Sequence, residues 1–420
     1  MDKFVIRGGR RLSGRVRISG AKNASLALMP AALLARGVVR LANTPRLRDV
    51  ATMASLLEVM GVQAEQKGDT LTLDTSRVRS QEAPYAHVKK MRASIYVLGP
   101  LVARYGRAKV SLPGGCAWGP RPVNLHLEGI RRLGADVRLE GGYIVASAGR
   151  LRGATVHFDI SSVGATGNTL MAAVLARGGS IIENAAVEPE ITTLACFLQA
   201  MGARIAGVGT SRLEIEGVDE LRPSDWTTIP DRIEAGTFLA AGAVTGGAVS
   251  LEGAEPDHLR AVQARLEDAG CTFTRDDAGL TLSAPERLRP VDVTSAPYPG
   301  FPTDMQAQWI ALMASAEGTS VVTDTIYHDR FKHVPELVRL GADIEMKENA
   351  AVVRGKRPLT GATVMSTDLR ASASLILAGL AARGTTEVLR VYHLDRGYEA
   401  IETKLQGLGA DIERVAGAEF

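Results

Sequence analysis

The sequence predicts an α/β protein with two similar domains, in each of which three repeats bury their helices inside surrounding sheet. Three observations predict this fold. A helix that ends in a glycine signal recurs six times in the 420 residues, a second helix that is apolar nearly all round recurs with the same period, and the two ends of the chain align with parts of one repeat. A chain of this length is too long for one ordinary core, which agrees with more than one domain.

The first recurring helix ends in LLEVMGV, IRRLGAD, FLQAMGA, RLEDAGC, LVRLGAD and LQGLGAD. A repeat of about 70 residues follows from the positions of its glycines, which are Gly61, Gly134, Gly202, Gly270, Gly341 and Gly409. Glycine just past a helix end supplies a left-handed C-cap. After each of the first five comes an alternating strand pair, such as DVRLEGGYIVAS, so each repeat also contributes antiparallel sheet.

The second recurring helix is rich in Ala, Gly and Ser. Its six copies read KNASLALMPAALLARG, MRASIYVLGPLVARYG, VGATGNTLMAAVLARGG, IEAGTFLAAGAVTGG, TDMQAQWIALMASAEG and LRASASLILAGLAARG. An apolar surface on every side indicates central burial, and small residues indicate close contact between helices. Each copy is followed by a strand-like segment, namely VVRLAN, KVSLPG, SIIENA, AVSLEG, SVVTDT and TEVLRV.

The chain ends suggest how the repeats close. The last repeat stops at DIERVAGAEF, while FVIRGGRRLSGRVRISGAKNAS near the N-terminus aligns with AVVRGKRPLTGATVMSTDLRAS at 351–372. We therefore expect the N-terminal strands to complete the sixth repeat. The domains would be 22–229, which is continuous and carries the loop around Cys116, and 1–21 plus 230–420, which is discontinuous. The chain would cross between them twice, near Ala21–Lys22 and near Trp226–Asp231, and such a double crossover is a natural hinge beside a cleft.

Composition excludes several classes of protein. A formal net charge of +3 gives no basis for a nucleic-acid binder driven by bulk charge. The N-terminal residues MDKFVIRGG contain no apolar signal-peptide core, and no apolar run approaches about 18 residues. We therefore expect a soluble, cytoplasmic protein with no nucleic-acid or membrane partner. The sequence leaves the oligomeric state open, with a monomer as one possibility.

The three cysteines differ in context. An odd count without a CxxC pair indicates neither a disulfide framework nor a zinc site, and no other metal-ligand pattern occurs. Cys196 and Cys271 lie in apolar helix and strand patterns and are predicted to be packing residues. Cys116 lies in SLPGGCAWGPRPVNLH, a loop set by glycine and proline just before a helix. Nearby Arg121 favours its thiolate and hence a reactive thiol, although an ordinary exposed turn remains the alternative.

Polar residues gather where the central helices begin. These starts carry Lys22-Asn23, Arg92, Ser162-Val163-Gly164, Asp231-Arg232, Thr303-Asp304 and Asp368-Leu369-Arg370. Helix N-termini present unpaired N–H groups and a positive dipole end, which suits phosphate. Together with Lys22, Arg92, Arg121, Arg370 and Arg396 they predict a local cationic pocket for phosphate or carboxylate oxygens.

Each of these residues also has a structural interpretation. A solvated lysine is unfavourable at a helix start, which favours a functional role for Lys22. Asp304 fits an ordinary N-cap equally well. Arg396 fits a surface ion pair with Asp395 or Glu399. The histidines show no ligand pattern and are interpreted as structural or peripheral, namely His126, His328, His333 and His393.

Ten segments, in order from end to end of the chain, carry a family resemblance. They are SGAKNAS, MRASIYVLGPLVAR, PGGCAWGPRPVNLHLEGI, SSVGATGN, IIENAAVEPEI, PDRIEAGTF, FPTDMQAQ, FKHVPEL, TDLRASASLILAG and YHLDRGYE. This set resembles the UDP-N-acetylglucosamine 1-carboxyvinyltransferases, the enolpyruvyl transferases of early peptidoglycan synthesis. The resemblance implies a two-domain inside-out α/β barrel with three repeats per domain.

The resemblance also implies an activity. The enolpyruvyl group of phosphoenolpyruvate would be transferred to the 3-hydroxyl of UDP-N-acetylglucosamine through a tetrahedral ketal, with release of phosphate and with no cofactor or metal. Cys116 would be the proton donor, able to form a thioether with phosphoenolpyruvate, and Asp304 the base for the sugar hydroxyl. Lys22 and Asn23 would hold phosphoenolpyruvate, while Arg121 and Arg396 would clamp its phosphate and carboxylate beside Arg370. The remaining implied contacts, to the nucleotide sugar, are Arg92, Arg121, Pro122, Val123, Asn124, Leu125, Ser161, Ser162, Val163 and Ile326.

Two positions depart from the family pattern. Asn124 stands where the family commonly has Asp, and Ile160 stands where many relatives have a lysine near the nucleotide. These departures concern the contacts to the nucleotide, not the reaction class.

Three alternatives stay open at this point. A 5-enolpyruvylshikimate-3-phosphate synthase would share the repeats and the donor, although the PGGC loop and YHLDRGYE favour the sugar-nucleotide branch. A non-catalytic sugar-nucleotide sensor would not need Lys22, Cys116, Asp304 and Arg396 together. An enzyme acting on nucleic-acid ends would need an extended basic or aromatic surface, which the sequence lacks.

Overall fold

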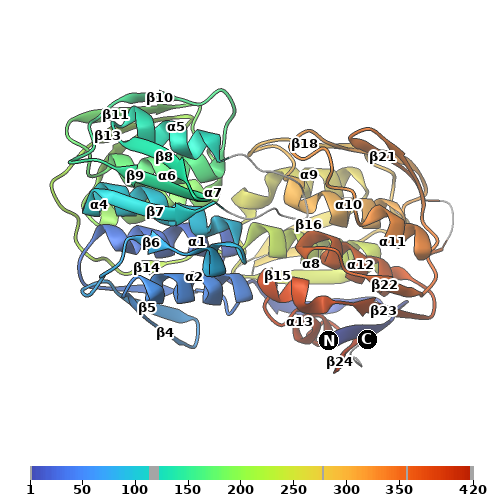
Figure 1. Ribbon diagram of the computed structural model, residues 1–420. Helices are drawn as coiled ribbons and strands as arrows, with labels where there is room; N and C mark the ends of the chain where they lie inside the picture. The colour runs from blue at the N-terminus through green and yellow to red at the C-terminus, as the bar shows by residue number, and fades with distance from the viewer. Residues whose placement is uncertain (1, 113–122, 277–278, 356–357, 417–420) are drawn as a thin grey trace. The chain divides into compact units, whose positions relative to one another are not determined.

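The computed structural model describes residues 2–112, 123–276, 279–355 and 358–416, and its fold is mixed α/β (Figure 1). The described chain divides into two compact units. One comprises Gly20–Ile229, and the other joins the residues up to Ser19 with those from Pro230 onward. Each unit has its own apolar core, with fully buried Phe158 and Phe197 in the first and Phe4, Phe238 and Trp309 in the second.

Each unit contains three four-stranded sheets. In Gly20–Ile229 they are β14 (Trp226–Thr227), β3 (Val38–Ala42), β5 (Thr70–Asp74) and β4 (Gln63–Lys67); β6 (Glu82–Ala83), β7 (Arg107–Ser111), β9 (Tyr143–Ser147) and β8 (Asp136–Glu140); and β10 (Thr155–His157), β11 (Gly179–Glu183), β13 (Arg212–Glu216) and β12 (Arg204–Ala206).

The other unit repeats this arrangement. Its sheets are β2 (Ser13–Arg17), β15 (Ala248–Glu252), β17 (Gly279–Ser283) and β16 (Thr272–Asp276); β18 (Val293–Ser295), β19 (Gly318–Asp324), β21 (Ala350–Gly355) and β20 (Asp343–Lys347); and β22 (Thr363–Met365), β23 (Thr385–Leu389), β1 (Asp2–Arg7) and β24 (Asp411–Ala416).

The sheets of each unit are linked in a ring. In every sheet the first-named strand pairs in parallel with the second, whereas the other pairings are antiparallel. That parallel strand comes from a different repeat: β6, for example, follows β5 in the chain but pairs with β7. The ring closes where β14 pairs with β3 in one unit and β2 with β15 in the other.

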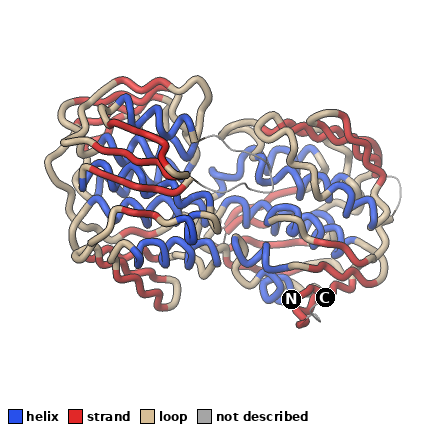
Figure 2. The backbone as a smooth tube through the Cα atoms, in the orientation of Figure 1, coloured by secondary structure: helices blue, strands red, loops and turns tan. Residues whose placement is uncertain are grey.

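Helices pack against the sheets of each unit, and central helices such as α12 lie inside the ring (Figure 2). The first unit contains α1 (Lys22–Ala31), η1 (Ala32–Leu34), α2 (Arg48–Val59), α3 (Tyr85–Val88), η2 (Arg92–Val97), α4 (Leu98–Tyr105), α5 (Asn124–Arg132), α6 (Val163–Ala173) and α7 (Pro189–Ala200), where η marks a 3-10 helix. The second contains α8 (Arg232–Val244), η3 (Pro256–Leu259), α9 (Arg260–Asp268), η4 (Thr303–Met305), α10 (Gln306–Met313), α11 (Val334–Arg339), α12 (Leu369–Ala381), η5 (Val391–Arg396) and α13 (Ile401–Gly407).

The sixfold repeat is confirmed. The six sheets correspond to the six predicted repeats, and all six repeat glycines have φ between 89° and 106°, the left-handed region that a glycine C-cap supplies. The central helices are buried on every side: in α12 the buried residues run without a break from Leu369 to Leu380. Among the described residues no helix is both long and apolar enough to cross a membrane.

The expectation that the N-terminal strands complete the sixth repeat is confirmed, although the two strands enter different sheets. β1 lies between β23 and β24 and completes the sixth sheet, with Phe4 opposite Val388 and Arg414. β2 instead pairs in parallel with β15 of the fourth repeat, Val16 lying opposite Leu251. The reason is that every repeat passes its last short strand to another sheet, and β2 is that strand of the sixth repeat.

We predict that Gly8→Ala strongly destabilises the unit that β1 completes. A Cβ at Gly8 would lie 2.2 Å from the Ala382 carbonyl oxygen and 2.4 Å from that of Gly379, so β1 would have to move away from α12. We expect a loss of about 2–4 kcal/mol of stability. Calorimetric unfolding midpoints provide the measurement. Gly149→Ala is the matched control, because nothing lies within 4 Å of its added Cβ, and equal midpoints for the two variants would contradict the prediction.

Candidate active site

In the unit that contains both chain ends, the Asp304 carboxylate is ion-paired to two arginines. Its Oδ1 lies 2.7 Å from Nη2 of Arg330, and its Oδ2 accepts a hydrogen bond of 2.7 Å from Nη2 of Arg370. Both arginine side chains are almost completely buried, whereas a quarter of the Asp304 side chain is exposed. The N-cap interpretation of Asp304 is wrong, because η4 has no side-chain cap. Asp304 therefore presents a carboxylate whose orientation is fixed by the two arginines.

Local structure explains why Arg370 reaches Asp304. Asp368 caps α12 by accepting hydrogen bonds of 2.9 and 3.0 Å from the backbone N–H groups of Arg370 and Ala371. Because Asp368 is the N-cap, α12 begins at Leu369 and Arg370 lies in its first turn. Burial alone would lower the pKa of Arg370, but its electrostatic interactions with Asp304 first, and then with the Tyr398 hydroxyl and Asp231, raise it above its ordinary value. The guanidinium is thus a permanent cation.

Arg330 is a member of this cluster that the sequence did not identify. Its Nη1 donates to Oγ1 of Thr303 at 3.0 Å, beside the Asp304 ion pair. It directly precedes the segment FKHVPEL, which the resemblance did include, but nothing in the sequence distinguishes a buried arginine from the many exposed ones.

A buried aspartate joins Ile326 to the same cluster. The Oδ2 of Asp324 accepts a hydrogen bond of 2.6 Å from Thr303, and its Oδ1 accepts one of 2.9 Å from the backbone N–H of Ile326. The turn after β19 is therefore tied to η4. Of the predicted residues in this unit, the structure brings Asp304, Arg370 and Ile326 together.

Arg396 ends η5, two residues before Tyr398, whose hydroxyl accepts a hydrogen bond of 3.3 Å from Arg370. The sequence suggested Asp395 as one possible ion-pair partner of Arg396. Both oxygens of the Asp395 carboxylate accept hydrogen bonds from Arg414, at 2.7 and 2.9 Å.

In the Gly20–Ile229 unit, Lys22 is the first residue of α1. Only 12% of its side chain is exposed, and its Nζ lies 3.7 Å from Oδ2 of Asp49, which belongs to α2 and is buried. Lys22 is therefore not a solvated surface lysine, the interpretation that its position at a helix start had already made unfavourable. Its position at a helix start is compensated by the Asp49 carboxylate, a partner that the sequence did not identify. Asn23 follows Lys22 in the same first turn and is partly exposed.

A second group of predicted residues meets at the start of α6. Ser162 caps this helix by accepting from the Ala165 N–H at 3.3 Å. A Cβ at Gly164 would lie 2.9 Å from the ring of His126, so α5 approaches α6 closely. Asn124 and Leu125 start α5 and Val163 starts α6, while Val123 is the N-cap residue of α5 and Ser161 precedes the α6 cap.

His126 is structural, as expected. Its Nδ1 lies 3.0 Å from the amide nitrogen of Asn168, which also donates to the Ile95 carbonyl at 2.8 Å. Burial, and then the positive charge of Arg92, lower the pKa of His126 to about 4, so the ring is neutral near pH 7. The effect of Arg92 also places that residue, which begins η2, near this group.

The remaining predicted residues are the three cysteines, two residues of the Cys116 loop, and Ile160. Cys116, Arg121 and Pro122 lie outside the described residues. Cys271 is buried, and burial raises the pKa of its thiol to about 11, which confirms a packing role. Cys196 is partly exposed on α7. Ile160 is 70% exposed, so nothing in its own packing prevents the lysine found in many relatives.

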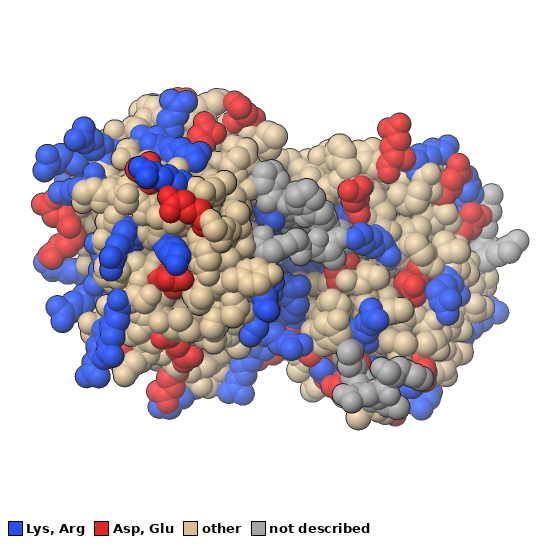
Figure 3. Space-filling model, viewed as in Figure 1, with Lys and Arg blue, Asp and Glu red and all other residues tan. Residues whose placement is uncertain are grey.

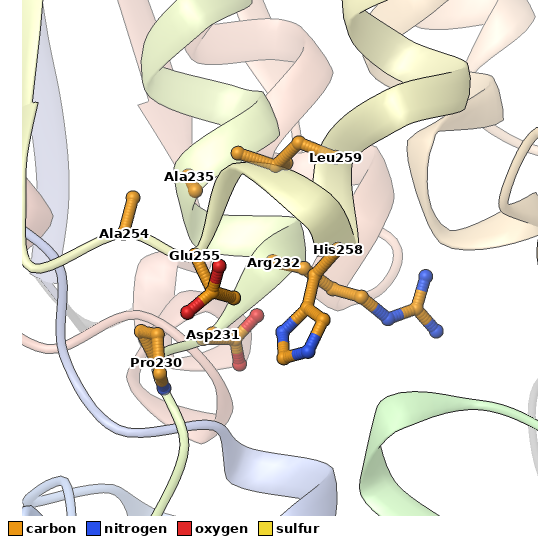
Figure 4. Close-up of a pocket in the computed structure, with 8 residues that line it drawn as sticks. All are labelled: Pro230, Asp231, Arg232, Ala235, Ala254, Glu255, His258 and Leu259. Carbon is orange, nitrogen blue, oxygen red and sulfur yellow. The ribbon is translucent and has the colours of Figure 1, made fainter. Parts of the chain in front are cut away.

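The surface adds two observations. On the face shown, basic and acidic side chains are interspersed on each unit (Figure 3). A very small pocket, with essentially no volume free for a water molecule, lies beside the start of α8, where Asp231, Glu255 and His258 point toward one another and Arg232 points away (Figure 4). Asp231 caps α8 there, with hydrogen bonds of 2.8 and 3.0 Å from the N–H groups of Ile233 and Glu234. A space this small does not hold a sugar nucleotide.

Comparison with known proteins defines the family. Residues 6–405 match the family model described as EPSP synthase (3-phosphoshikimate 1-carboxyvinyltransferase). UDP-N-acetylglucosamine 1-carboxyvinyltransferases from Chloroherpeton thalassium and Chlorobium limicola are 59% and 58% identical to this chain, with 100% of this chain and 99% and 100% of the relative covered.

Solved structures agree with this result. The enolpyruvyl transferase NikO from Streptomyces tendae has a TM-score of 0.87 at 30% identity, with 99% of each chain covered. An EPSP synthase from Acinetobacter baumannii has a TM-score of 0.76 at 19% identity, with 99% of this chain and 100% of that chain covered, and shows the shared fold alone. The chain therefore has the two-domain enolpyruvyl transferase fold, and it belongs to the UDP-N-acetylglucosamine 1-carboxyvinyltransferase family.

Proposed function

We propose that this protein transfers the enolpyruvyl group of phosphoenolpyruvate to the 3-hydroxyl of UDP-N-acetylglucosamine, with release of phosphate, in peptidoglycan synthesis. Full-length identity of 59% to a UDP-N-acetylglucosamine 1-carboxyvinyltransferase supports this acceptor over shikimate 3-phosphate. The observation that carries the mechanism is the Asp304 carboxylate held by Arg330 and Arg370. We also propose that the enzyme acts in the cytoplasm.

The proposed reaction has an addition step and an elimination step. In the addition, the methylene carbon of phosphoenolpyruvate gains a proton while the sugar oxygen bonds to the neighbouring carbon and loses its own proton. The resulting tetrahedral ketal carries the phosphate, the carboxylate and the sugar on one carbon. In the elimination, the bond from this carbon to the phosphate oxygen breaks and the methyl group gives up a proton, so that the enol ether is restored.

Asp304 is the proposed base for the sugar hydroxyl. Its two oxygens are each occupied by one arginine, but a carboxylate has about four acceptor positions, so it retains capacity for a proton. A quarter of its side chain is exposed, which leaves it accessible from one side. The arginines fix its orientation, and such a fixed charge needs no rearrangement at the moment of reaction.

Cationic groups are proposed to hold the donor. Lys22 and Asn23 would bind phosphoenolpyruvate, and Arg121, Arg370 and Arg396 would neutralise its phosphate and carboxylate. The buried Asp49 partner lies 3.7 Å from the ammonium group of Lys22 and limits its movement. Cys116 would supply the proton for the methylene carbon. The nucleotide sugar would be bound by Arg92, by the segment Arg121–Leu125, by Ser161–Val163 and by Ile326.

We expect phosphate release from phosphoenolpyruvate in the presence of UDP-N-acetylglucosamine and none above background with shikimate 3-phosphate. A coupled phosphate assay with each acceptor in turn provides the measurement. Turnover with shikimate 3-phosphate alone would support an EPSP synthase instead. Binding of the sugar nucleotide without turnover would support a non-catalytic sensor.

Lys22→Ala is expected to lower kcat/KM for phosphoenolpyruvate at least about tenfold, which corresponds to roughly 1.4 kcal/mol of transition-state stabilisation. The loss arises because the variant removes the cation that binds the donor. Steady-state kinetics measures it, with Lys67→Ala as the control, since that lysine is 80% exposed and pairs only with neighbouring Glu65 among the ion pairs described. An unchanged rate would remove Lys22 from the site.

Fosfomycin, an epoxide that resembles phosphoenolpyruvate, is expected to alkylate Cys116. The thiolate opens the epoxide without a leaving group, so the protein gains the whole mass of the inhibitor. Intact-mass measurement in the presence of UDP-N-acetylglucosamine tests this, with Cys116→Ser as the control. An adduct that persists in Cys116→Ser, or no adduct in the natural protein, would refute it.

A further inference from the structure

The hydroxyl group of Tyr398 lies where all three central helices of its unit meet. It is 2.9 Å from Oγ1 of Thr237 in α8, 3.2 Å from Nε2 of Gln308 in α10 and 3.3 Å from Nη1 of Arg370 in α12. Tyr398 is only 2% exposed, and burial raises the pKa of its hydroxyl, so the proton stays on the oxygen. None of the roles proposed above uses this residue.

Two of the hydrogen bonds to the Tyr398 hydroxyl have a fixed direction. Arginine and the amide nitrogen can only donate, so Arg370 and Gln308 both donate to the Tyr398 oxygen. With two donors on the Tyr398 oxygen, its own proton is available to Thr237, whose hydroxyl donates to the Ile233 carbonyl at 2.8 Å. The result is a connected series of hydrogen bonds from the guanidinium to the backbone of α8.

This chain fixes one side of Arg370 while Asp304 fixes the other. Nη1 of Arg370 is bound by Tyr398, and its Nη2 is bound by Oδ2 of Asp304 at 2.7 Å. The Tyr398 ring also lies near the guanidinium, with 5.6 Å from its centroid to Cζ. A phenylalanine would keep the ring but remove the acceptor for Nη1, and a lost acceptor at a buried charge is costly.

We propose that Tyr398 is a positioning residue for the transfer reaction: it sets the orientation of the Arg370 guanidinium and, through that group, of the Asp304 carboxylate. The inference rests on the proposed assignment of Arg370 and Asp304 to the active site. An ordinary core tyrosine would contribute to stability alone. A positioning residue acts on kinetics, and only while Arg370 is present.

The test is a double-mutant cycle of Tyr398→Phe and Arg370→Gln, with kcat and KM measured for each substrate and unfolding midpoints recorded. We expect Tyr398→Phe to lower kcat/KM for phosphoenolpyruvate about tenfold while the KM for UDP-N-acetylglucosamine changes less than about twofold. In the Arg370→Gln background the same change should have almost no further kinetic effect. Equal losses in both backgrounds, or unchanged kinetics in a folded Tyr398→Phe protein, would overturn the proposal.

Two further variants complete the design. Tyr105→Phe is the matched control and should leave the kinetics unchanged, because its hydroxyl is buried without a hydrogen-bond partner among the described residues. If Arg370→Gln does not fold, Thr237→Val replaces it: losing the acceptor of the tyrosine proton should lower kcat/KM for phosphoenolpyruvate, and unchanged kinetics would count against the proposal. Failure of the proposed function would show in the natural protein itself, whereas failure of this inference shows only in the variants.

Discussion

Enclosure of the central helices by sheet is the constraint on which the rest of the structure depends. A helix such as α12, buried from Leu369 to Leu380, has no solvent-facing side on which to place charged groups. An unpaired charge in its middle would cost several kcal/mol. Charged groups therefore lie where these helices begin. Asp231 and Asp368 cap their helices, and Lys22 and Arg370 form ion pairs.

The same enclosure favours polar groups further inside that join neighbouring helices through hydrogen bonds. In each unit, the sixth residue of one central helix is such a polar group, namely Asn168 in α6 and Thr237 in α8. Asn168 accepts from the Gly99 N–H at 2.7 Å and donates to the Ile95 carbonyl, which ties α6 to η2 and α4. Thr237 ties α8 to Tyr398 and Gln308. The two units thus stabilise similar helix bundles with different polar residues.

The sequence was sufficient for the parts of the fold that depend on local pattern. Period, helix type and the six glycine caps are all properties of short segments, and each was predicted correctly. The placement of β2 was missed because alignment of the chain ends showed which repeat it resembles but not which sheet accepts it. Among the candidate residues, Lys22, Asp304 and Arg370 were singled out because they start helices in segments that resemble a family. Asp49, Arg330 and Tyr398 were missed because their contacts join residues far apart in the chain, and no local pattern marks a buried partner.

The ring of sheets also has a consequence for the order of folding. Every strand and helix of the Gly20–Ile229 unit is present once synthesis has passed its last short strand, β14, so this unit can close its ring early. The strand made first cannot do so. β1 pairs with β23 and β24, where Asp2 lies opposite Ala416, and it has no place in a sheet until almost the whole chain exists. Throughout synthesis its apolar residues Phe4 and Ile6, both fully buried in the finished protein, therefore lack their final partners. The first strand to leave the ribosome is one of the last to be paired.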